Sequence, residues 1–133
     1  MINTMDSEQI KELLNRAIAV RENAYAKYSN FAVGAALLCG DGEIIVGCNV
    51  ENAVYGLAIC AERVAMTQAV AKGQMNFEAI AIAANPLAPP CGTCRQFMAE
   101  FNPNLTIISC DSASPEKQNT WRLAELLPEQ FKL

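Results

Sequence analysis

The sequence "FEAIAIAANPLAPPCGTCRQFMAEFNPNLTIIS", residues 77–109, contains the pattern from which the topology of the chain follows. The apolar run "FEAIAIAA" predicts a buried strand, and "LTIIS" predicts a second one. Between them, Pro90 favours the first turn of a helix over residues 91–101. A strand, a helix and a strand in this order form a crossover between parallel strands in a sheet that helices cover. The stretch therefore predicts an α/β layered fold.

The flanking sequence predicts the remaining elements of the same sheet. Asp6 or Ser7 can cap a first helix that runs to about Ala24, with Gln9 as the capping-box partner of Asp6. Two β-rich runs separated by "GDG" predict a hairpin over residues 31–49. Good helix formers predict a helix over residues 58–72 that ends at Gly73. The tail, residues 117–131, suggests one short strand and a short final helix.

Length and composition limit the classes of protein that this chain can represent. With 133 residues and 52% hydrophobic content, we expect a single domain over residues 1–133. The N-terminus is neither basic nor followed by an apolar run, and no stretch is long enough to span a membrane, so we expect a soluble cytoplasmic protein. The net charge of −4 and the scattered basic residues disfavour a nucleic-acid partner.

Cysteine is the residue type most informative about chemistry, because the chain has six cysteines and no histidine. Cys91 and Cys94 lie in the first turn of one predicted helix, and Cys60 opens another. The N-termini of these helices can meet at one edge of the sheet. Three thiolates suit a zinc ion, which in catalytic sites leaves its fourth tetrahedral position to water.

A pair of cysteines three positions apart, such as Cys91 and Cys94, also occurs in structural zinc sites, in redox proteins and by chance. A closed structural site needs a fourth thiolate, for which three further cysteines are available in principle: Cys39, Cys48 and Cys110. They fall inside or at the end of apolar strands, so packing is the better interpretation for all three.

Three charged residues near these cysteines have predicted roles. Glu62 follows Cys60 by two residues and is poorly directed to ligate the same ion, which suggests a proton carrier. Three thiolates and one zinc ion carry a net negative charge that needs compensation. Arg63 and Arg95 are placed to supply it, although an arginine such as Arg63 is by default an ordinary residue of a helix surface.

The sequence closely resembles the small zinc-dependent cytidine deaminases of nucleoside salvage. The resemblance rests on "YSNFAVGAAL" (28–37), "GCNVENAVYGLAICAERVA" (47–65), "PCGTCRQFMAEF" (90–101) and "ELLPEQF" (125–131). It implies a three-layer cytidine deaminase-like fold, with a mixed β-sheet of about five strands and helices on both faces. It also implies one Zn²⁺ per chain, held by Cys60, Cys91 and Cys94, with Glu62 as the catalytic proton shuttle.

The resemblance further implies how a nucleoside would be bound. Asn49 and Glu51 resemble the pair that grips the ribose 3′-hydroxyl, although such residues by default simply end a strand. Phe31 resembles the aromatic residue that packs on the base, which does not exclude a packing role in the core. The backbone of Ala61 would also contact the base.

The family that the sequence resembles forms homotetramers with shared active sites. Two further aromatic residues, Tyr55 and Phe131, correspond to residues that reach a neighbouring subunit's site. Without the resemblance, Phe131 would be interpreted as an anchor for the last helix. One departure is visible, because Pro89 stands where these enzymes usually have serine.

The leading functional hypothesis is therefore hydrolytic deamination of cytidine and 2′-deoxycytidine. One alternative is deamination of another aminopyrimidine nucleoside, such as a nucleoside antibiotic. Another is a non-catalytic zinc or thiol protein. Deamination of polynucleotides is disfavoured by the acidic isoelectric point near 4.8.

Overall fold

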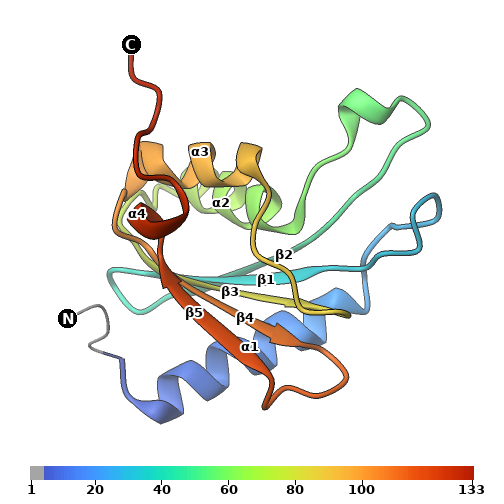
Figure 1. Ribbon diagram of the computed structural model, residues 1–133, viewed down its shortest axis with the longest axis horizontal. Coiled ribbons are helices and arrows are strands. Elements are labelled where there is room, and N and C mark those ends of the chain that lie inside the picture. Colours follow the sequence, from blue (N-terminus) through green and yellow to red (C-terminus); the bar gives the residue numbers. More distant parts are fainter. Residues whose placement is uncertain (1–4) are drawn as a thin grey trace.

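The structure is a computed structural model that describes residues 5–133, and it consists of one mixed sheet between two layers of helices (Figure 1). The elements follow the chain in this order: α1 (Ser7–Arg21), β1 (Gly34–Cys39), β2 (Ile44–Cys48), the 3₁₀-helix η1 (Tyr55–Leu57), α2 (Ala61–Ala71), β3 (Phe77–Ala84), α3 (Gly92–Phe101), β4 (Thr106–Asp111), β5 (Gln118–Arg122) and α4 (Leu123–Leu126). None of the helices described in residues 5–133 has the length and hydropathy of a membrane-spanning segment.

The sheet confirms the crossover that the sequence predicts. Its strands lie in the order β2-β1-β3-β4-β5. β3 and β4 pair in parallel, and α3 connects them. β1 pairs antiparallel with both β2 and β3, which confirms the hairpin, and β4 pairs antiparallel with β5. The polar tail therefore does add one edge strand and one short helix.

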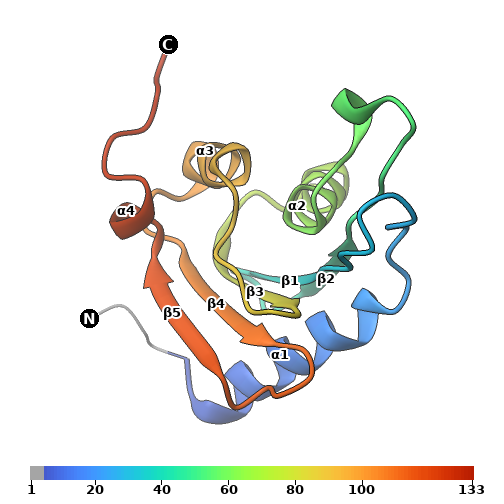
Figure 2. The same cartoon turned by 45° about the vertical axis from the view of Figure 1, so that its right-hand side comes forward.

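Helices cover both faces of the sheet, as Figure 2 shows with α1 on one side and α2 and α3 on the other. α1 begins with the expected capping box, in which Asp6 accepts from the Gln9 backbone and Gln9 accepts from the Asp6 backbone. Its buried residues, Leu13, Leu14 and Ala17, pack against the sheet. The second core lies under α2 and α3, where Met66 and Met98 are fully buried. The three-layer architecture is thus confirmed.

Two predicted helix boundaries are wrong by three residues. α1 ends at Arg21 rather than near Ala24. α2 begins at Ala61 rather than Ala58, because the preceding residues are extended and Ile59 exchanges backbone hydrogen bonds with Val50. The short η1 helix was not predicted. The C-terminal boundary of α2 is confirmed, since Gly73 adopts a φ of +84° just after it.

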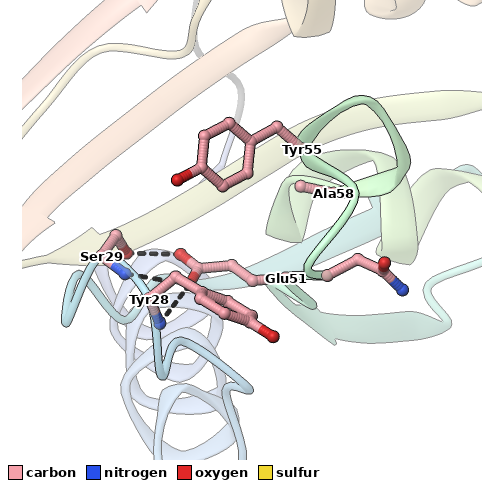
Figure 3. Close-up of a pocket in the computed structure, with 6 residues that line it drawn as sticks. Tyr28, Ser29, Glu51, Tyr55 and Ala58 are labelled. Atoms are coloured by element: carbon pink, nitrogen blue, oxygen red, sulfur yellow. Dashed lines mark hydrogen bonds between the residues drawn. The ribbon is translucent and has the colours of Figure 1, made fainter.

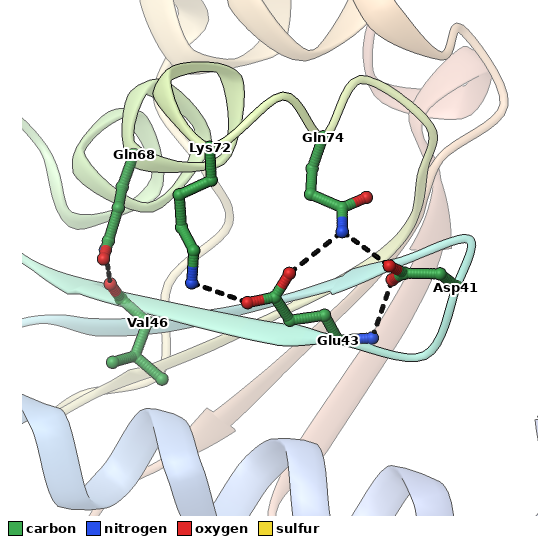
Figure 4. Close-up of polar contacts among 6 residues, drawn as sticks. All are labelled: Asp41, Glu43, Val46, Gln68, Lys72 and Gln74. Atoms are coloured by element: carbon green, nitrogen blue, oxygen red, sulfur yellow. Dashed lines mark hydrogen bonds and ion pairs between the residues drawn. The ribbon is translucent and has the colours of Figure 1, made fainter.

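A polar network ties the C-terminal end of α2 to the β1–β2 turn (Figure 4). Lys72 Nζ lies 2.6 Å from Glu43 Oε2, and Gln74 Nε2 donates to both Asp41 and Glu43 at 2.6 and 2.9 Å. These contacts lower the pKa of Asp41, chiefly through Gln74, and the pKa of Glu43, chiefly through Lys72. The network therefore fixes the end of α2 that lies away from Cys60.

A close approach of backbones fixes the N-terminal half of α2. Gly47 in β2 faces this helix, and a Cβ there would lie 2.5 Å from the Ala65 nitrogen and 2.7 Å from the Ala61 carbonyl oxygen. Real Cβ atoms do not approach backbone atoms so closely, so only glycine allows α2 to lie this near the sheet. The position of Ala61 and of the residues beside it depends on that spacing.

We expect Gly47→Ala to destabilise the protein by at least about 1–3 kcal/mol, because the added methyl group must push α2 away from β2. Urea unfolding followed by circular dichroism measures the change. Gly92→Ala is the matched control, since a Cβ at that position meets no atom within 4 Å and should leave stability nearly unchanged. Equal stability of the Gly47→Ala protein and the unmodified protein would contradict the proposed spacing constraint.

Candidate functional site

Three cysteines meet where the N-termini of α2 and α3 come together. Cys60 is the N-cap of α2, Cys91 is the N-cap of α3, and Cys94 lies in the first turn of α3. Their sulfur atoms all lie within 4.8 Å of one another, and those of Cys60 and Cys91 are 3.8 Å apart. Two sulfurs bonded to one zinc at about 2.3 Å in a tetrahedron are themselves about 3.8 Å apart. The cluster therefore fits a zinc ion with one open position.

The other three cysteines do not join this cluster. Cys39 and Cys110 are fully buried in the two cores, and Cys48 is half-buried at the end of β2. Burial raises the pKa of all three thiols, so they stay neutral. Within residues 5–133, the only group of three or more potential ligands this close is Cys60, Cys91 and Cys94. The packing interpretation agrees with these positions.

The cluster favours a thiolate at Cys60. Hydrogen bonding from Cys94, then from Arg63 and Cys91, lowers the pKa of Cys60 to about 5 against the opposing effect of burial. The Arg63 Nη2 atom lies 3.7 Å from the Cys60 sulfur. The pKa of Cys94 is raised by its hydrogen bond to Cys60 and by burial. A site that stabilises one thiolate before any metal binds is suited to a cation.

Glu62 is a buried carboxyl group beside the cluster. It is the second residue of α2 and only 5% exposed. Burial raises its pKa to about 7, and the negative charge of Cys60 adds to this effect, whereas its own backbone N–H and Arg63 oppose it. A carboxyl group with a pKa near neutrality can both take up and release a proton.

A cavity of about 230 Å³ opens onto these groups. It is lined by most of the residues that the sequence analysis selected: Phe31, Asn49, Glu51, Cys60, Ala61, Glu62 and Cys91. Val33, Ile82 and Ala84 add apolar walls, and Pro89 also lines it. The structure thus brings together candidate metal ligands, a buried acid, polar side chains and an aromatic ring in one pocket, as small-molecule sites generally do.

Asn49 and Glu51 both hold the loop that carries Phe31. Asn49 accepts from the Val33 backbone at 2.9 Å and donates to the Phe31 carbonyl at 2.8 Å. Glu51 Oε1 accepts from the backbones of Tyr28 and Ser29, each at 3.0 Å, and Oε2 accepts from the Ser29 hydroxyl (Figure 3). These two polar side chains therefore fix one wall of the cavity.

Sequence reasoning missed Ser29 and Ser109, which both hold backbone segments at the cavity. Ser109 is buried in β4, and its hydroxyl donates at 2.8 Å to the carbonyl of Ala88, a cavity residue. The signal for Ser29 lay in "YSNF", where a small polar residue precedes Phe31 by two positions. For Ser109 the signal was a lone hydroxyl inside an apolar strand, since buried hydroxyl groups need partners.

The side chain of Arg95, on α3, contacts backbone carbonyl groups near the cysteine cluster. Its Nε donates to the Pro90 carbonyl at 2.8 Å, and its Nη1 donates to the Leu126 carbonyl at 3.1 Å. The guanidinium group thus joins the segment before Cys91 to the end of α4. Its predicted role in charge compensation stays a prediction.

The two remaining predicted residues lie outside this cavity. Tyr55 is 82% exposed and lines a second cavity of about 280 Å³, which shares Ser29 and Glu51 with the first. Figure 3 shows Tyr55 and Tyr28 on opposite sides of Glu51. Phe131 is 70% exposed, and its backbone forms two hydrogen bonds of 3.1 Å with the side chain of Gln96 on α3. In Figures 1 and 2 the C-terminal tail and η1 lie on opposite sides of the molecule.

The family model for the cytidine and deoxycytidylate deaminase zinc-binding region matches residues 7–110. The chain belongs to this deaminase family. The matched region contains all three clustered cysteines, and the family is a zinc-binding one, so zinc is the cofactor that the cluster fits.

Individual members of the deaminase family match nearly the whole chain. The sequence is 46% identical to a cytidine deaminase of Halalkalibacterium halodurans, over 90% of this chain and 91% of that protein. It is 42% identical to a cytidine deaminase of Sporosarcina psychrophila, over 92% and 90%. The crystal structure of a cytidine deaminase from Burkholderia pseudomallei superposes with a TM-score of 0.86 at 42% identity, covering 96% of this chain and 100% of that one.

Proposed function

We propose that this protein catalyses the hydrolytic deamination of cytidine and 2′-deoxycytidine to uridine and 2′-deoxyuridine, with release of ammonia, in pyrimidine salvage. The observation that carries the proposal is the buried Glu62 in one cavity with the cysteine cluster. Relatives named cytidine deaminase that align with at least nine-tenths of the chain support the same reaction. Their names favour cytidine over the alternative of another aminopyrimidine nucleoside.

Cys60, Cys91 and Cys94 are the proposed zinc ligands, with one ion per chain. Bound there, zinc would supply Lewis-acid activation of the water that attacks the substrate. Arg63, 3.7 Å from the Cys60 sulfur, would offset part of the thiolate charge. Arg95 would act at longer range, since it donates to the backbone just before Cys91.

Glu62 is the proposed proton carrier. As the new bond forms between the water oxygen and C4 of the base, the C4=N3 double bond opens, and the Glu62 carboxyl group carries the first proton of the water to N3. The same group then carries the second proton, from the hydroxyl on C4, to the amine; the bond between C4 and this nitrogen breaks to release ammonia, and the oxygen becomes the C4 carbonyl. The burial of Glu62 supports this role, because a pKa near 7 lets one group make both transfers at neutral pH.

Asn49 and Glu51 are the proposed ribose-binding residues. A carboxylate offers about four acceptor positions, and the described hydrogen bonds of Glu51 use three of them. One position on Oε2 is left for a 3′-hydroxyl donor. Asn49 uses one of its two amide hydrogens on the Phe31 carbonyl, which leaves the other for the same hydroxyl.

Phe31 and Ala61 are the proposed contacts with the base. Phe31 lines the cavity and is 36% exposed, so its ring is accessible to a ligand. Ala61 is fully buried at the first position of α2, where backbone N–H groups have no partner within the helix. One of these groups can therefore bind a polar atom of the cytosine ring.

We further propose a homotetramer with shared active sites. Large apolar side chains are exposed along and around η1, notably Val54, Tyr55 and Leu57, and such patches mark interaction surfaces. Tyr55 would close the second cavity, of about 280 Å³, against a neighbouring chain. Phe131 lines neither of the two cavities described above, and its exposed side chain would reach the site of another chain.

A cytoplasmic location and a purely small-molecule substrate complete the proposal. All six cysteines are free thiols, which a reducing compartment maintains. A chain with a net charge of −4 is also poorly suited to binding polynucleotides.

We expect ammonia release from cytidine and 2′-deoxycytidine, and far slower release from cytosine or a cytosine-containing oligonucleotide. Glu62→Gln should keep fold and zinc but lower kcat by about 10²–10⁴-fold or more, because an amide cannot carry the proton. Steady-state assays with the purified holoenzyme, with zinc content measured in parallel, test both expectations. An unmodified protein that is inactive on nucleosides would reject the function, and a Glu62→Gln enzyme with more than about a tenth of the normal rate would reject the role of Glu62.

We expect about one zinc per chain, and loss of zinc and activity together in Cys60→Ala, Cys91→Ala or Cys94→Ala proteins. Metal analysis after gel filtration measures the stoichiometry. Cys48→Ala is the control, since this half-buried thiol is outside the cluster and should leave zinc unchanged. A fully metallated and active Cys94→Ala protein would contradict the assignment. Thiol–disulfide exchange activity without deamination would instead favour the thiol-protein alternative.

We expect activity to return when Glu62→Gln and Phe131→Ala chains are co-expressed, each being nearly inactive alone. A mixed oligomer contains sites that combine an intact Glu62 from one chain with an intact Phe131 from another. Affinity tags on the two chains allow purification of mixed oligomers, and light scattering gives their size. A fully active monomer, or mixed oligomers without recovery, would show that Phe131 does not complete a neighbour's site.

A further inference from the structure

Ser29 connects two of the proposed substrate-binding residues through a single hydroxyl group. The hydroxyl donates its hydrogen to Glu51 Oε2, and its oxygen accepts the backbone N–H of Phe31 at 3.0 Å. The backbone N–H of Ser29 also donates to Glu51 Oε1 at 3.0 Å. Ser29 lines both cavities, the one of about 230 Å³ beside the cysteine cluster and the one of about 280 Å³ beside Tyr55. The carboxylate and the aromatic residue are therefore held by the same short loop.

This arrangement directs the one remaining acceptor position of Glu51. Among the described contacts, the Ser29 hydroxyl is the only side-chain donor to this carboxylate, and it occupies one of the two acceptor positions on Oε2. Figure 3 shows the Ser29 and Tyr28 contacts converging on Glu51 from one side. The free position of Oε2 must then face away from the loop. Hydrogen bonds to a charged oxygen are strong enough to select one orientation of the side chain.

We propose that Ser29 is a positioning residue that sets Glu51 and Phe31 in one geometry, so that recognition of the sugar 3′-hydroxyl and packing on the base are adjusted together. The inference rests on the proposed nucleoside deaminase function. Ser29 contacts no reacting atom in this scheme and acts through its two partners. Its hydroxyl is thus a determinant of selectivity for nucleosides that carry a 3′-hydroxyl.

Removing the Ser29 hydroxyl should weaken substrate binding more than it slows the chemical step. In Ser29→Ala, Oε1 of Glu51 keeps its two backbone donors, but Oε2 loses its side-chain donor and the Phe31 N–H loses its acceptor, whereas Glu62 and the cysteine cluster keep their contacts. We expect KM for cytidine to rise about tenfold, with kcat changed less than about threefold. 2′,3′-Dideoxycytidine lacks the hydroxyl that Glu51 would bind, so its kcat/KM should fall much less. The preference for cytidine over this analogue should shrink by about fivefold or more.

The experiment compares Ser29→Ala, Ser29→Thr and the control Ser7→Ala as holoenzymes on both nucleosides. Ser29→Thr keeps the hydroxyl at an exposed position and should restore the preference, while Ser7, on the exposed start of α1, should have no effect. A double-mutant cycle adds Ser29→Ala to Glu51→Ala. If Ser29 acts through Glu51, the second change should lower the cytidine preference less than about twofold further.

The possible outcomes separate this inference from the function on which it rests. An unmodified enzyme that is active on cytidine, with an unchanged preference in Ser29→Ala, overturns the role of Ser29 alone. That role is equally overturned if Ser29→Thr fails to restore the preference. It is also overturned if the losses of cytidine preference in Ser29→Ala and Glu51→Ala multiply in the double mutant. An unmodified protein that is inactive on both nucleosides overturns the proposed function and this inference together.

Discussion

The meeting of two helix N-termini above the sheet is the arrangement on which the site depends. Each helix start presents unpaired N–H groups and the positive end of its dipole, and Cys60 and Cys91 occupy these two starts. The parallel crossover through α3 and the close contact of α2 with Gly47 bring the starts together. The sulfur atoms of Cys60, Cys91 and Cys94 can therefore lie within 4.8 Å of one another, with a thiolate favoured at Cys60.

The sequence predicts the framework of the fold because that framework rests on local patterns. Apolar runs and glycine or proline punctuation identify β1 to β4, the polar tail suggests only one further short strand, and the capping box at Asp6 is a purely local signal. The predicted start of α2 was wrong because Ala58 is a good helix former, whereas the next residue, Ile59, pairs with Val50. This pairing joins two segments whose contact no local pattern reports, so tertiary structure overrides propensity there.

The residues of the candidate site also fall into those that the sequence identifies and those that only the structure reveals. Cysteine spacing and the acid beside Cys60 are visible in the sequence, and the structure places them in one cavity. Ser29 and Ser109 leave only a local signal, a small polar residue before Phe31 and a lone hydroxyl in an apolar strand, because each acts through a hydrogen bond to a residue about twenty positions away. The sequence does not identify the distant partner of such side chains. Their importance depends on which surface the held segment lines.

The spacing of Cys60 and Cys91 along the chain also links folding to metal affinity. The two residues are 31 positions apart, so an unfolded chain must close a loop of that size to bring them to one ion. Closing such a loop costs roughly 3–4 kcal/mol of chain entropy, and the folded sheet has already closed it. The native protein should therefore hold the ion several hundred times more tightly than the same thiols on a flexible chain. By thermodynamic linkage, the ion stabilises the native state by its preferential binding free energy.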